Sequence, residues 1–132
     1  GDVLMVLSDL PKGRALAKCF HADADDLYAV NQRVCRLEAH SIDSKFLCML
    51  LNRHPKLLAF DDGMNQTHLK KDAVLQCPLL VPPDIAEQHR IATCLSSLDD
   101  LIAVQSDRIS ALQTHKQGLL QQLFPSLTPA EA

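Results

Sequence analysis

Residues 84–124, DIAEQHRIATCLSSLDDLIAVQSDRISALQTHKQGLLQQLF, decide the fold of this chain. The stretch follows two consecutive prolines, contains none itself, has Gly118 as its one glycine, and ends before another proline. Asp84 can cap a helix, and Glu87 stands three residues later, which is the spacing of a capping box. The sequence therefore predicts one uninterrupted helix of roughly 60 Å, at about 1.5 Å per residue.

Ten positions of this helix, spaced alternately by four and three residues, form a heptad seam that is mostly apolar. They are Ile91, Leu95, Leu98, Ile102, Gln105, Ile109, Leu112, Lys116, Leu119 and Leu123. Such a repeat is typical of a coiled coil, and polar seam residues fix the register or the partner at some cost in stability. Because a domain of the size of residues 1–83 is only about 25–30 Å across, we expect the far half of the helix to pack against a helix from a second copy or another subunit.

The part before the prolines predicts a small, β-rich, mixed domain, so that the fold class is α+β with one long C-terminal coiled-coil helix. An apolar run at 3–7 indicates a strand buried on both faces. Further strands are expected at 15–20, 28–37 and, as an edge strand containing Pro78, 77–81. Ser8–Gly13 is expected to be a loop.

Helices are expected at two places in this part of the chain. Ile42, Phe46, Met49 and Leu50 recur at the spacing of one helix face, with Ser41 or Asp43 available as the cap. A short helical segment is expected over 69–75. The polar stretch 61–67 lies between these two and is expected to be an open loop.

Composition excludes several classes of function. The chain has four glycines and five cysteines without a Cys-x-x-Cys pair. We therefore expect no glycine-rich phosphate loop, no zinc site, no cofactor, and free thiols in a reducing cytoplasm. No apolar run is long enough to span a membrane. The chain also starts abruptly inside a strand-like run without Met, as expected of a fragment of a longer protein.

The charges are unevenly distributed. Residues 1–83 carry ten Lys or Arg and ten Asp or Glu, whereas residues 84–132 carry three basic and six acidic residues. A strongly basic nucleic-acid footprint is absent.

Two polar loops nevertheless carry side chains that can contact DNA. Asn and Gln amides can bind adenine N6 and N7 bidentately, an Arg can bind guanine O6 and N7, and Lys can contact phosphate. An ordinary solvated loop is the alternative for each. The candidate DNA-binding residues are Lys12, Arg14, Asn65, Gln66, Thr67, Lys70 and Lys71.

Read together, the motifs closely resemble the specificity subunit of type I restriction-modification systems over nearly the whole chain. The resemblance rests chiefly on Pro82-Pro83 with Glu87-Gln88 at the start of the helix, and on the run from Lys116 to Phe124, KQGLLQQLF, at its end. In that family a subunit has two target recognition domains, each followed by a long helix, and the two helices pair antiparallel. The resemblance implies a partial target recognition domain at 1–83 and a spacer or dimerisation helix with a short tail at 84–132.

The function implied is non-catalytic recognition of a bipartite sequence in double-stranded DNA. Methylation and cleavage would belong to methyltransferase and restriction subunits, and two copies of this chain would pair as a homodimer through antiparallel helices. An assembly module that binds a partner subunit without reading DNA is the alternative. A small hydrolase built on Cys19 and His21 is a third.

Overall fold

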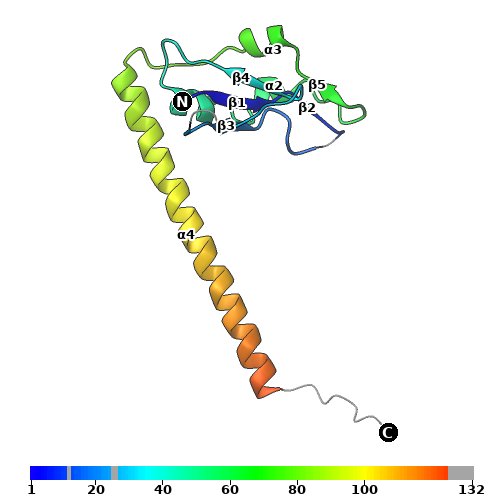
Figure 1. Cartoon of the computed structure of the whole chain (residues 1–132), viewed down its shortest axis with the longest axis vertical. Coiled ribbons are helices and arrows are strands. Elements are labelled where there is room, and N and C mark those ends of the chain that lie inside the picture. Colours follow the sequence, from blue (N-terminus) through cyan, green and yellow to red (C-terminus); the bar gives the residue numbers. More distant parts are fainter. Residues whose placement is uncertain (12, 25–26, 125–132) are drawn as a thin grey trace. The chain divides into compact units, whose positions relative to one another are not determined.

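The computed structural model describes residues 1–11, 13–24 and 27–124. It divides into two units, Gly1–Thr93 and the chain from Cys94 onward. The described elements confirm the α+β class, with small sheets and short helices in the first unit followed by a long C-terminal helix (Figure 1).

The long helix α4 spans Ile85–Leu123, within one residue of the predicted limits at each end. The Asp84 carboxylate accepts a hydrogen bond of 2.9 Å from the backbone N–H of Ala86, so that the expected cap is present. Gln88 and Ala92 are the buried residues of this helix. Among the described helices, none combines the length and the apolar character that crossing a membrane requires.

Three antiparallel strands form the main sheet in the order β3-β1-β4: β3 is Cys19–His21, β1 is Val3–Val6 and β4 is Val34–Leu37. Side chains alternate across the central strand β1: Val3 and Met5 are fully buried, whereas Leu4 and Val6 are half-buried. The expectation of a strand buried on both faces was therefore wrong, because only one face of this sheet is covered by the core.

The strand predictions were too long for identifiable backbone reasons. Ala17 has a φ of 55° and donates its N–H to Val6, so the chain turns there and β3 begins only at Cys19. Asn31 closes a turn by accepting hydrogen bonds from Arg33 and Val34, which delays the start of β4.

Two further strand predictions were wrong, one for residues 77–81 and one for Ser8–Asp9. Residues 77–81, which include Pro78, are described without regular structure, because proline has no N–H for a ladder. Conversely, Ser8–Asp9 forms a short strand, β2, where a loop was expected, and it pairs with β5 at Thr67–His68.

Three short helices complete the first unit: α1 at Ser44–Leu51, α2 at Pro55–Leu58 and α3 at Lys71–Leu75. Asp43 caps α1 by accepting from the N–H of Phe46 at 2.8 Å, so one of the two predicted caps is confirmed. The helix α2 was not predicted. The buried core is formed by Met5, Leu16, Ala17, Leu51, Leu57, Leu69 and Val74.

Replacing Met5 by Ala should cost about 2–5 kcal/mol of folding free energy, because it removes a fully buried side chain from the core. Leu4→Ala on the half-buried face is the matched control and should cost less. Tyr28 is the one tyrosine and tryptophan is absent, so tyrosine fluorescence during urea unfolding reports on this unit. An equal loss in both variants would contradict the one-sided burial of β1.

Candidate nucleic-acid interface

The pairing of β2 with β5 brings together two loops that lie far apart in the sequence. Asp9 pairs with Thr67 and Ser8 with His68, antiparallel. The first loop, of which residues 10, 11 and 13–16 are described, leaves the ribbon after Asp9, and the loop at 61–66 enters it before Thr67. Both loops therefore emerge at the same end of the ribbon, beside the β2 and β5 labels in Figure 1.

The Asp9 carboxylate organises the first loop. It accepts backbone hydrogen bonds from Leu10 at 2.8 Å, Ala15 at 2.7 Å and Leu16 at 3.2 Å. A Cβ atom at Gly13 would overlap this carboxylate, which explains the glycine. Arg14 is exposed on the loop so formed.

Two adjacent carboxylates organise the second loop in the same way. Asp61 accepts from the N–H of Gly63 at 2.9 Å, and Asp62 accepts from the N–H groups of Met64 at 2.8 Å and Asn65 at 2.9 Å. The side-chain amide of Asn65 also donates to Asp62, at 3.1 Å. Asn65 and its neighbour Gln66 are both exposed, but the Asn65 amide also hydrogen-bonds within its own loop.

The other candidate residues differ in their placement. Thr67 is half-buried, and its hydroxyl donates to Asp61 at 3.2 Å. Lys70 precedes α3 and Lys71 begins it, beyond the opposite end of the ribbon, so they do not join the two loops. Lys12 lies outside the described residues.

Hydrogen bonding lowers the pKa of two of the loop carboxylates, Asp9 and Asp62. The N–H of Ala15 is the main influence that lowers the pKa of Asp9, against a smaller opposing effect of desolvation. The backbone N–H groups of Asn65 and Met64 lower the pKa of Asp62, with the Asn65 side chain adding to them. The loops are thus shaped by negative charges whose lone pairs already face backbone donors.

Cys19 and His21 each have another hydrogen-bond partner. Burial raises the pKa of the Cys19 thiol to about 12, which disfavours the reactive thiolate. Its Sγ donates to the carbonyl oxygen of Ala17 at 3.7 Å, and His21 Nε2 lies 2.9 Å from the Ser44 hydroxyl. Within the described part of the chain, no group of three or more Cys, His, Asp or Glu side chains could hold a metal ion.

The seam of α4 forms an apolar stripe that is open in the single chain. Leu98 is 50% exposed, Ile109 is 56% exposed and Leu112 is 59% exposed. Gln105 and Lys116 are exposed on the same stripe. An exposed apolar stripe of this length is typical of an interaction surface.

The loop at 61–66 should lose its shape in acid. A carboxyl group whose pKa is lower in the folded state contributes stability above its unfolded pKa, about 3.9 for Asp. That contribution disappears as the pH falls through the lower folded value of Asp62. The NMR signals of the Met64 and Asn65 amides should therefore shift together below about pH 4.

The variant Asp62→Asn removes this titration and should leave the two amide signals without a shared acid transition. A transition that persists in this variant would show that another group shapes the loop.

The comparisons with known proteins agree with one another. The family model described as the type I restriction modification DNA specificity domain matches residues 17–114. A protein of Methanocaldococcus jannaschii, described as the type I restriction enzyme MjaX specificity subunit, is 30% identical over 107 residues, which cover 74% of this chain and 24% of that protein. The chain thus spans about a quarter of the length of this relative. No solved structure matches. Since the family model covers well over half of the residues, the chain belongs to the family of type I restriction modification DNA specificity domains.

Proposed function

We propose that this chain is the DNA sequence-recognition module of a type I restriction-modification system and that it performs no catalysis itself. The observation that carries the proposal is the ribbon pairing of β2 with β5, which gathers two polar loops at one end of a specificity-family domain. Base edges in the major groove are read by side chains of the kind these loops present.

Some residues of the two loops contact bases, and others support the shape of the loop. Arg14 and Gln66 are exposed, and they are suited to guanine and adenine respectively. Asn65, which is also exposed, and the half-buried Thr67 support the second loop, where their side chains hydrogen-bond to carboxylates. Lysines 12, 70 and 71 serve as phosphate contacts, which position the protein without specifying sequence.

The exposed α4 seam supports a second proposal, that two copies of the chain form a dimer. Two copies pair through antiparallel α4 helices, and each copy presents one recognition part, residues 1–83, to one half of a bipartite target. Residues 84–132 then act as spacer and dimerisation segment. Two-fold pairing makes the two half-sites inverted repeats of each other.

Catalysis falls to partner subunits in this scheme. A methyltransferase subunit and a restriction subunit bind the module in the cytoplasm and act on the DNA that it selects. The equal numbers of basic and acidic residues in 1–83 imply weak nonspecific attraction to DNA. The basic charge needed for tight binding then comes from the partners.

The variants Arg14→Ala and Gln66→Ala should each relax the choice of one base pair, because each removes a bidentate contact that contributes about 1–3 kcal/mol of discrimination. The measurement is selection from randomised duplexes by the chain together with its methyltransferase subunit. Lys45→Ala and Gln76→Ala are matched controls, since both residues are exposed and neither belongs to the two loops: Lys45 lies on α1 and Gln76 follows α3.

Unchanged base preferences in both loop variants would refute the assignment of these residues. Capture of the methyltransferase subunit without any sequence preference in the wild-type chain would favour the assembly module instead.

The chain should form a dimer, with twice its mass of 14.6 kDa in light scattering. Ile109→Glu should dissociate the dimer, because it places a charge in the apolar seam. Lys116→Leu should strengthen the pairing but loosen its register.

Thr114→Glu is the matched control for Ile109→Glu, since Thr114 lies on α4 outside the seam positions. A monomeric wild-type chain at micromolar concentration, or a Thr114→Glu variant that dissociates as readily as Ile109→Glu, would contradict pairing through the seam.

A further inference from the structure

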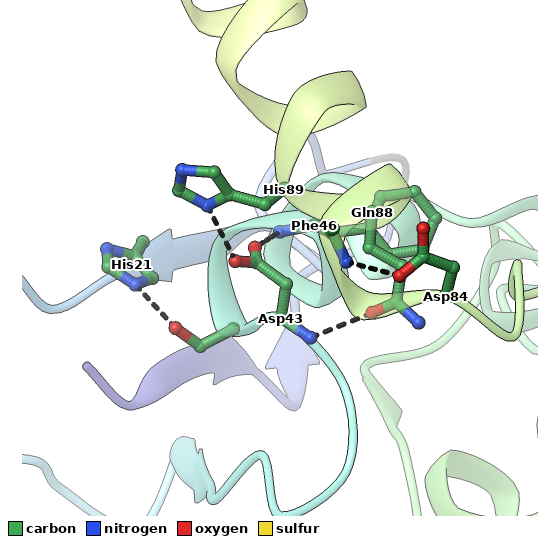
Figure 2. Close-up of polar contacts among 8 residues, drawn as sticks. His21, Asp43, Phe46, Asp84, Gln88 and His89 are labelled. Atoms are coloured by element: carbon green, nitrogen blue, oxygen red, sulfur yellow. Dashed lines mark hydrogen bonds and ion pairs between the residues drawn. The ribbon is translucent and has the colours of Figure 1, made fainter.

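Gln88 is a polar side chain buried near the start of α4. It is 1% exposed, and both ends of its amide are used. Its Nε2 donates to the carbonyl oxygen of Pro82 at 2.7 Å, and its Oε1 accepts from the backbone N–H of Asp43 at 2.8 Å. One side chain thus joins the helix to the segment that enters it and to the start of α1. Figure 2 shows the bond between Gln88 and Asp43.

The neighbouring residue His89 contacts the same aspartate from its other side. Its Nδ1 lies 3.1 Å from Asp43 Oδ2, while Asp43 Oδ1 caps α1 at the N–H of Phe46. Burial acts against ionisation of Asp43, but the hydrogen bonds from Phe46 and His89 together lower its pKa. Figure 2 shows Asp43 between these two helix starts, with its backbone directed to Gln88 and its carboxylate to His89.

A second buried residue lies one turn further along α4. Ala92 is 1% exposed and follows Gln88 by four residues, on the same face of the helix. From this junction, α4 continues without interruption to Leu123.

We propose that Gln88 is a positioning residue for bipartite recognition. It holds the N-terminal end of α4, here called the root of α4, against the recognition part. In this way it determines the distance between half-sites that the dimer accepts. This inference rests on the proposed function. His89 assists at the solvent-exposed edge, where its side chain is 69% exposed.

The chemistry of a buried amide suits this role better than that of an apolar side chain. A leucine could fill the same space, but apolar packing is non-directional, whereas two hydrogen bonds to fixed backbone atoms set one orientation. Truncation of Gln88 would leave the Asp43 N–H and the Pro82 carbonyl without these partners.

The first test measures spacing on DNA. The full chain, bound to its methyltransferase subunit, selects its target from randomised duplexes, and that target is then rebuilt with the half-sites moved apart or together in single base-pair steps of about 3.4 Å. The variant Gln88→Ala should keep the half-site sequences but accept at least one additional spacing. Gln117→Ala, an exposed glutamine of the same helix, should behave as the wild type.

The second test needs no DNA. Residual dipolar couplings of the backbone amides in the full chain report whether α4 and the residues before it keep one common orientation. A single alignment should fit both in the wild type and in Gln117→Ala, and two different alignments should be needed for Gln88→Ala. Gln88→Glu retains the acceptor for Asp43 and loses the donor for Pro82. Its couplings should therefore deviate from a single alignment less than those of Gln88→Ala and more than those of the wild type. This variant replaces Gln88→Ala in the test if Gln88→Ala does not fold.

The outcomes separate this inference from the proposed function. Weaker binding of Gln88→Ala at every spacing without a broader range, or couplings equal to those of the wild type, would overturn the positioning role. A wild-type chain that selects no sequence would refute the proposed function, whereas the couplings would still decide whether Gln88 fixes the root of α4.

Discussion

The antiparallel pairing of Ser8–Asp9 with Thr67–His68 is the constraint on which the candidate interface depends. Each strand has only two residues, yet the pairing brings the two polar loops to one end of the ribbon. The neighbouring bond from the N–H of Leu69 to the carbonyl oxygen of Leu7, at 2.8 Å, extends the ribbon, and Leu69 is buried in the core. The core therefore holds the ribbon in register, and the ribbon in turn holds the loops.

Three carboxylates hold backbone N–H groups of these loops by hydrogen bonds. Asp9, Asp61 and Asp62 each accept backbone hydrogen bonds from residues in their own loop. Such local bonds are typical of Asp in turns. They add negative charge at a surface that we propose for DNA, so recognition there depends on well-placed base contacts more than on general attraction to phosphate.

The sequence predicted the long helix and the α1 cap well because both follow from local rules. Proline boundaries, helical spacing and a capping Asp43 act over a few residues, and the structure has α1 and α4 close to the predicted positions. The strands were predicted less well. Their ends depend on a left-handed Ala17, which no composition rule indicates, and on a turn closed by the Asn31 side chain.

The candidate site was only partly predictable for a related reason. Residue type singled out Arg14 and Gln66, but the nearness of their loops depends on a strand pairing across nearly sixty residues of sequence, which periodicity cannot reveal. The contact of Asn65 with a base remains a prediction, and the bond from its amide to Asp62 could not be inferred from the sequence. Gln88 was noted only as part of a motif, because nothing in a single sequence tells a buried glutamine from an exposed one.

The most direct test of the central claim is an NMR titration of the full chain with the duplex that it selects. The account predicts that the amide signals of residues 10–16 and 61–66 change together as DNA is added, while those of the exposed seam at Leu98 and Ile109 stay unchanged. Changes confined to α4, or to only one of the two loops, would contradict a shared reading surface at the end of the β2–β5 ribbon.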